Sequence, residues 1–166
     1  RFAFMDSPGF DAALWQEVLK QANDAALPSG PILQASGRDA GAVQMARANA
    51  LRAGVSEMIE FSQRAVSSIQ PPQMPGMVVT NPPYGVRVRS GHDLRNLYDQ
   101  FGKVLRANCP GWQAAILCSD PVLLGHTRLK FDRCYFFNNG GINVQLACAI
   151  ITSVESNLLS FRKLTS

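Results

Sequence analysis

Four consecutive residues in the middle of the chain could do chemistry together: Asn81, Pro82, Pro83 and Tyr84. They follow a short apolar run, residues 76–80, which is typical of a buried strand. The two prolines remove two backbone donors, and each residue that precedes a proline is pushed to extended backbone angles. The loop therefore presents the side-chain oxygen of Asn81 and the carbonyl oxygen of Pro82 as two neighbouring acceptors.

Two convergent acceptors suit an exocyclic amino group, which has two hydrogens to donate. Holding both N–H bonds favours a pyramidal nitrogen and directs its lone pair at an electrophile, which is preorganised electrostatic catalysis without a strong base. The ring of Tyr84 can supply a flat face for a stacked heterocycle, worth about 1–3 kcal/mol per base. The same residues could instead form a rigid connector with a satisfied Asn81 cap and a half-buried Tyr84. A proline-rich peptide ligand fits less well, because the loop is short and internal.

Composition places the chain among globular proteins. Its 166 residues fit one domain, and 46% hydrophobic with 17% charged residues argues against disorder. No apolar run is long enough to span a membrane and the N-terminus has no signal-peptide pattern, so we expect a cytoplasmic protein without a membrane partner. The four cysteines and two histidines form no ligand-like cluster, and we expect no metal and free thiols. The formal charge of +4 suits a polyanionic partner but is too small to identify one.

The elements that must position the loop alternate along the chain. Three segments have apolar residues at helical spacing: residues 11–24, 39–54 and 93–107. Four short apolar runs predict buried strands: residues 31–36, 57–61, 76–80 and 112–119. Residues 133–151 predict an antiparallel hairpin around an Asn-Asn-Gly-Gly turn. Strands separated by helices imply an α/β fold with a mostly parallel sheet, in which ligands bind at the carboxyl ends of strands.

Several of these stretches resemble one family of enzymes. "TNPPYG" after a buried strand resembles motif IV of the S-adenosylmethionine-dependent amino methyltransferases. The longer "VVTNPPYGVRV" is similar to the THUMP-associated RNA methylases, the family of the bacterial 23S rRNA guanine-N2 methyltransferase, and "DAGAVQMARANALRAG" and "GWQAAILCSDPVLL" agree with it. The similarity covers about residues 1–151, a partial methyltransferase domain, and leaves residues 152–166 as an unassigned tail. It implies a Rossmann-like fold, S-adenosylmethionine as cofactor, and RNA, in particular rRNA, as partner.

The resemblance also implies roles for individual residues. Asn81 and Pro82 would accept the target amino group, with guanine N2 as the expected target. Pro83 would hold the shape of the loop, and Tyr84 would stack on a base that has been flipped out of its helix. Ser36 and Asp39, at the end of an expected strand, are the candidate cofactor-binding residues. Asp39 also has the position of a helix cap, which is an alternative role for it.

The chain departs from the family on the cofactor side. It contains no Asp-Pro-x-Cys-Gly-Ser-Gly loop, and two acidic positions of the family align with Gly37 and Ala65. We therefore expect a partial domain that lacks the N-terminal strand and the glycine loop, binds S-adenosylmethionine weakly or not at all, and has little activity alone. Two classes stay open, an amino methyltransferase whose glycine loop lies upstream and a degenerate fold that binds RNA or acts as a scaffold. DNA adenine N6 and protein glutamine are rival substrates, because the same tetrapeptide serves them.

Overall fold

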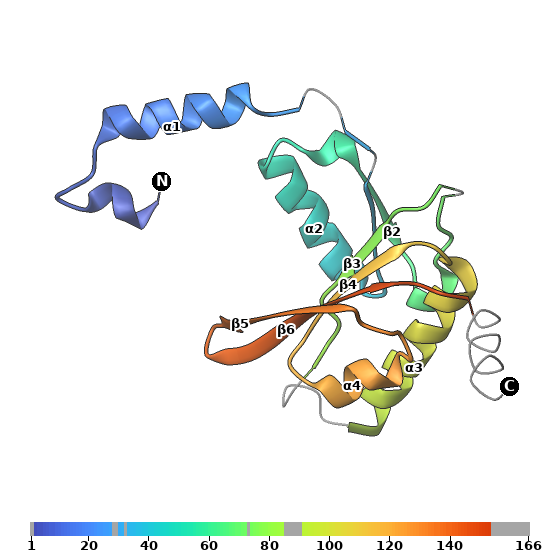
Figure 1. Cartoon of the computed structure of the whole chain (residues 1–166). Helices are drawn as coiled ribbons and strands as arrows, with labels where there is room; N and C mark the ends of the chain where they lie inside the picture. The colour runs from blue at the N-terminus through green and yellow to red at the C-terminus, as the bar shows by residue number, and fades with distance from the viewer. Residues whose placement is uncertain (1, 28–29, 32, 73, 85–90, 154–166) are drawn as a thin grey trace, which may run out of the picture. The chain divides into compact units, whose positions relative to one another are not determined.

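A computed structural model describes the chain except for residues 1, 28–29, 32, 73, 85–90 and 154–166 (Figure 1). The helices are α1 (Ala12–Asp24), α2 (Ala40–Arg52), α3 (Gly91–Asn108) and α4 (Pro121–His126). The strands are β1 (Leu33–Gly37), β2 (Ile59–Gln63), β3 (Met77–Thr80), β4 (Gln113–Cys118), β5 (Arg133–Asn139) and β6 (Ile142–Ile150). Short 3-10 turns lie at Ala3–Asp6, Ser56–Met58 and Val66–Ser68. The tail expected at residues 152–166 lies, from residue 154 onward, outside the described residues.

The chain divides into two compact units. One comprises Arg1–Ala35 and Gln44–Ser62, and the other comprises Ser36–Val43 and Gln63–Ser166. The predicted helices and strands form within about two residues of their expected bounds, because their apolar spacing matches the helix and strand periods. Within the described part of the chain, no helix combines the length and the apolar character that crossing a membrane requires.

The strands form two sheets. β1 pairs with β2 in a two-stranded sheet, and β3, β4, β6 and β5 form a four-stranded sheet in that order. β3 runs parallel to β4, whereas β6 runs antiparallel to both β4 and β5. The α/β class and the C-terminal antiparallel hairpin are confirmed, whereas the expected mostly parallel sheet is not, because only the β3–β4 pair of the four-stranded sheet is parallel. The four-stranded sheet is mixed because the chain returns from β5 through a tight turn and inserts β6 between β4 and β5 (Figure 1).

Helix α3 supplies the centre of the core in the four-stranded unit. Its apolar residues recur at helical spacing, and four of them are buried: Leu94, Tyr98, Phe101 and Leu105. They pack with Leu123 and Leu124 of α4 and with alternate residues of the sheet, including Ile116 and Ala147. One face of the sheet is therefore buried beneath α3 and α4.

The sequence analysis did not predict α4. This short helix begins directly after β4, where the Asp120 side chain accepts hydrogen bonds from the N–H groups of Val122 (2.8 Å) and Leu123 (3.3 Å). Pro121 occupies the first turn, where its missing N–H costs nothing. An aspartate cap followed by proline is a start signal that the sequence contains. Its six residues are too few to show a helical apolar period, so the spacing alone did not reveal it.

Candidate active site

The Asn-Pro-Pro-Tyr loop lies where the sequence predicted, directly after the carboxyl end of β3. Asn81 and Pro83 are exposed, whereas Pro82 and Tyr84 are half-buried. Tyr84 packs against the core beneath the four-stranded sheet. The loop thus combines an exposed carboxamide with a ring that the core supports on one side.

A buried tyrosine connects this loop to the neighbouring strand. The Tyr98 side chain is completely buried, and its hydroxyl donates a hydrogen bond to the Pro83 carbonyl at 3.4 Å. The same hydroxyl lies 3.2 Å from the Sγ atom of Cys118, the last residue of β4. Burial raises the pKa of Tyr98, and the contact with Cys118 raises it further. The phenol therefore keeps its proton at physiological pH and can act as a donor.

A groove opens at the end of the sheet where β3 and β4 finish. Its volume is about 740 Å³, and its lining combines aromatic rings with three carboxamides and a hydroxyl: Ser119, Pro121, Phe136, Phe137, Asn138, Asn143, Val144 and Gln145. Phe136 is 78% exposed, so a ring face is available for stacking. A second, smaller cavity of about 170 Å³ borders the start of β3 and the end of β6. Ligands in such sheets bind at the carboxyl ends of the parallel strands, which favours the larger groove.

Strand register links the groove to the loop. Cys118 on β4 pairs with Gln145 on β6, and Gln145 pairs with Phe136 on β5. Directly opposed residues of antiparallel strands share one face of a sheet, so these three side chains lie in one row. The row begins at the Cys118 thiol, beside the hydroxyl that contacts Pro83. The loop after β3 and the groove at the hairpin therefore lie at the same end of the four-stranded sheet.

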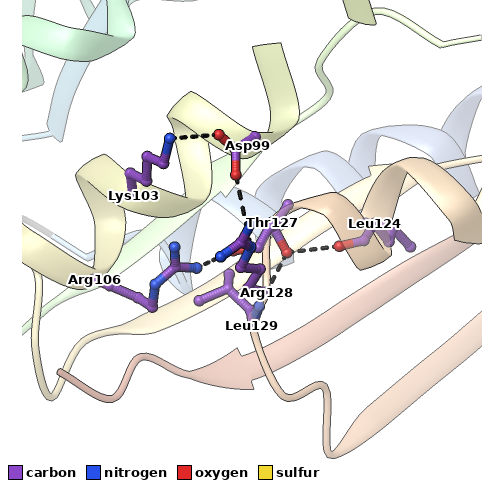
Figure 2. A network of polar contacts seen from close by, with 7 residues as sticks. All are labelled: Asp99, Lys103, Arg106, Leu124, Thr127, Arg128 and Leu129. Carbon is purple, nitrogen blue, oxygen red and sulfur yellow. Dashed lines mark hydrogen bonds and ion pairs between the residues drawn. The ribbon is translucent and has the colours of Figure 1, made fainter. Parts of the chain in front are cut away.

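A polar network holds α3 against the end of α4 (Figure 2). The Arg106 guanidinium, which is buried, donates a hydrogen bond to the Thr127 carbonyl, and burial lowers its pKa from the usual value. Asp99 pairs with Lys103 at 2.7 Å and with Arg128 at 3.7 Å. The hydrogen bond from Lys103 holds the pKa of Asp99 below its usual value. The network therefore holds the end of α4 against α3.

Gly102 allows the two helices to approach each other closely. A Cβ atom at this position would lie 1.9 Å from the Thr127 carbonyl oxygen, which no side chain can tolerate. The hydrogen bond from Arg106 and the close approach of Gly102 thus both involve the Thr127 carbonyl. Both contribute to the position of α4.

The candidate cofactor residues lie in a different setting. Ser36 and Asp39 are both exposed, at the end of β1 and just before α2. The Oδ1 atom of Asp39 accepts a hydrogen bond from the Ala42 N–H at 2.6 Å, which is the contact of a helix cap. Gly37 and Arg38 lie between the two residues, and Gly37 offers no side chain. These groups fit a cofactor in part: Ser36 and the second oxygen of Asp39 can hydrogen-bond a ribose, but they do not enclose it.

The thiols and the acidic residues give no metal centre among the described residues. All four cysteines are free, with Cys109 and Cys118 buried. Burial raises the pKa of Cys109, so this thiol stays protonated. No group of three or more His, Cys, Asp or Glu side chains in the described part of the chain could hold a metal ion.

The arrangement defines an α/β methyltransferase fold, and comparison with known structures agrees with it. SMU.472, a candidate methyltransferase crystallised with SAH, superposes with a TM-score of 0.77 at 26% identity over 93% of this chain and 41% of that chain. A predicted N6-adenine-specific DNA methylase from Listeria monocytogenes superposes with a TM-score of 0.67 at 26% identity, over 82% of this chain and 35% of that chain. The predicted fold is confirmed.

The family follows from the sequence match. Residues 3–148 match the model of the RMKL-like methyltransferase domain, and the chain belongs to this family. It is 37% identical over 144 residues to the ribosomal RNA large subunit methyltransferase K/L of Legionella pneumophila (strain Lens), covering 87% of this chain and 20% of that protein. The same-named protein of Shewanella amazonensis is 36% identical over 146 residues, with 86% and 21% covered. The chain spans about a fifth of the length of these curated relatives.

Proposed function

We propose that this chain forms the base-receiving part of an S-adenosylmethionine-dependent RNA methyltransferase that modifies the N2 amino group of guanine in ribosomal RNA. The observation that carries the proposal is the Asn-Pro-Pro-Tyr loop at the end of β3, whose Tyr84 packs on the core, at the same end of the sheet as an aromatic groove. The curated relatives that match this chain are named as ribosomal RNA methyltransferases, which supports the choice of rRNA.

The chain's own residues prepare the amino group for reaction. The Asn81 side-chain oxygen and the Pro82 carbonyl oxygen each accept a hydrogen bond from one of its two N–H groups. An aryl amine is a poor nucleophile because its lone pair is delocalised into the ring, and two fixed acceptors favour the pyramidal form in which the lone pair is available. These contacts strengthen as the nitrogen becomes pyramidal, so they stabilise the transition state more than the ground state.

The base itself is held by ring faces. Tyr84 stacks on the flipped guanine, and its support by the core reduces the entropy lost on binding. Phe136 and the carboxamides of the groove receive an adjacent nucleotide, since exposed bases are recognised by aromatic stacking and by amide hydrogen bonds. Sequence analysis did not identify the groove residues, because the pattern "YFFNN" predicts a strand without showing which ring lies exposed.

The proposal requires S-adenosylmethionine as the methyl donor, and its support is the neighbouring structure crystallised with SAH. Ser36 and Asp39 are the contacts that we assign to this chain. They are too few and too exposed to hold the cofactor by themselves. We therefore expect the isolated 166 residues to bind it weakly or not at all, which is also the expectation from the sequence.

The test is methyl transfer by the intact protein that carries this chain. Labelled S-adenosylmethionine is supplied with unmodified ribosomal RNA, and the modified base is identified after digestion. Label in N2-methylguanine supports the proposal, provided that Asn81→Ala abolishes most of it. A parallel reaction with DNA tests the second candidate, which the structural neighbour named as an N6-adenine-specific DNA methylase suggests, and label in DNA adenine but not in RNA would favour it. RNA binding without any transfer would favour a scaffold.

A further inference from the structure

The sequence fixes almost every torsion of the loop between its two functional groups. Proline rings lock φ at Pro82 and Pro83, and the residues before them, Asn81 and Pro82, are restricted in ψ. The ψ angle of Pro83 is therefore the one soft backbone torsion between the amino-group acceptors and the φ angle of Tyr84. That angle also sets the direction of the Pro83 carbonyl. A group that holds this carbonyl therefore orients Tyr84 relative to Asn81.

The structure contains such a group. The Tyr98 hydroxyl lies 3.4 Å from the Pro83 oxygen and 3.2 Å from the Cys118 Sγ. The Asp120 N–H reaches the same sulfur at 3.4 Å. The thiol can donate either to the Tyr98 oxygen or to the Asp120 carbonyl at 3.4 Å, and in both arrangements the Tyr98 hydroxyl keeps its proton for Pro83. The alternative, with Tyr98 donating to sulfur, leaves the Pro83 carbonyl without this donor.

We propose that Tyr98 is a positioning residue that sets the stacking angle of Tyr84 through the Pro83 carbonyl. This inference rests on the proposed function, since Tyr84 is the ring that stacks on the base. Tyr98 itself is completely buried in the core and does not touch the substrate. The 3.4 Å contact is longer than a typical O–H···O hydrogen bond, so its effect is that of a weak one.

The experiment compares Tyr98→Phe with wild type in the intact protein, using methyl transfer to ribosomal RNA. The substitution removes only the hydroxyl and keeps the ring in the core. We expect kcat/KM to fall about threefold to fivefold, in the lower half of the range for one neutral hydrogen bond. Tyr135→Phe, the same change at an exposed tyrosine on β5, is the matched control and should leave kcat/KM unchanged.

A double-mutant cycle separates positioning from loss of stability. If Tyr98 acts through Tyr84, Tyr98→Phe should cost little more activity in a Tyr84→Ala background, because there is no ring left to orient. An equal loss in both backgrounds would overturn the proposal. So would wild-type kcat/KM for Tyr98→Phe. Absence of transfer by the wild-type protein would refute the proposed function instead, and the two failures are thereby distinguished.

A second substitution covers the case in which Tyr98→Phe does not fold. Cys118→Ala removes the sulfur that lies 3.2 Å from the Tyr98 hydroxyl without changing the ring or the loop. Its kcat/KM should fall in the same direction by less, about twofold to threefold, because Tyr98 keeps its own proton for Pro83. The loss should again vanish in the Tyr84→Ala background. No change in either variant would contradict the assignment.

Discussion

The ends of β3 and β1 carry the two sides of the candidate site, and they are built differently. At the end of β3, Tyr84 packs on the core and Pro83 is held by a buried hydroxyl. At the end of β1, Ser36 and Asp39 are exposed. Among the described residues that precede α3, Ala50 is the only buried hydrophobic one. The proposed base side therefore contacts the core of the four-stranded unit through Tyr84 and Pro83, whereas Ser36 and Asp39 on the proposed cofactor side are exposed.

This contrast explains why the Asn-Pro-Pro-Tyr loop is strong evidence for a site, whereas Ser36 and Asp39 are weak evidence for one. A loop can direct two acceptors only when its backbone cannot rearrange, and burial of its neighbours provides that rigidity. At the end of β1, the side chain of Asp39 is held by its cap contact with the Ala42 N–H and does not pack against the core. Substitutions on the base side should therefore change catalysis and stability strongly, and those on the cofactor side should have small effects.

The largest effect is expected for Asn81→Ala in the intact protein. It removes one preorganised contact to the amino group, and kcat should fall on the order of 10²–10³. RNA affinity should change little, because the contact gains its strength only as the nitrogen becomes pyramidal. Single-turnover methyl transfer and RNA binding titrations measure the two quantities separately. Full activity in this variant would refute the catalytic role of Asn81.

Packing beneath the loop gives the second prediction. Gly102→Ala places a methyl group where the Thr127 carbonyl lies, 1.9 Å from it, and should lower the free energy of unfolding by about 3 kcal/mol. Gly125→Ala is the control, because nothing lies within 4 Å of a Cβ there. Alanine is the better helix former, so this change should stabilise by up to about 1 kcal/mol. Urea unfolding measures the free energy of unfolding of both variants. Equal values for the two would show that α3 and the end of α4 do not pack this closely.

Tyr84 tests the stacking side of the same region. Tyr84→Ala should weaken binding of RNA that carries the flipped base by about 1–3 kcal/mol, because stacking is already present before reaction. Tyr84→Phe keeps the ring face, and its affinity should stay close to wild type. Fluorescence titration with a short RNA measures both. A loss in Tyr84→Phe as large as that in Tyr84→Ala would mean that the hydroxyl, rather than the ring, makes the contact.

Much of this architecture could be predicted because periodicity and proline chemistry are local properties. The helix at 93–107 was expected from its apolar spacing, and the hairpin from its two glycines, Gly140 and Gly141, which adopt φ angles of 60° and 86°. The loop after β3 was identified from four residue types in a row. Each of these signals lies within one short stretch of sequence.

What could not be predicted depends on contacts between distant segments. Tyr98 belongs to the apolar stripe of α3, and the spacing predicts burial without showing that its hydroxyl reaches Pro83. The row from Cys118 through Gln145 to Phe136 depends on strand register, which a single sequence does not reveal. The mixed sheet could not be predicted for the same reason, because the position of β6 between β4 and β5 depends on contacts between distant segments.

The smallest effect, at Asp39, tests the cofactor side. Its Oδ1 atom caps α2 by accepting from the Ala42 N–H, which leaves Oδ2 available to a ribose hydroxyl. Asp39→Ala removes the cap, at about 1 kcal/mol, and hydrogen exchange at the Ala42 amide should quicken about fivefold. Asp39→Asn caps almost equally well, and exchange should stay unchanged.

The asparagine variant separates the two roles of Asp39. Its side-chain oxygen can still cap α2, but its amide nitrogen cannot accept a bond from a ribose hydroxyl. If Asp39 contacts the cofactor, Asp39→Asn should weaken S-adenosylmethionine binding by the intact protein while α2 keeps its protection. Calorimetry and amide exchange on the same variant measure the two effects. Unchanged affinity in Asp39→Asn would leave Asp39 as a helix cap alone, and the contrast between the two strand ends would then be complete, with a fixed site on β3 and only a structural role at Asp39 after β1.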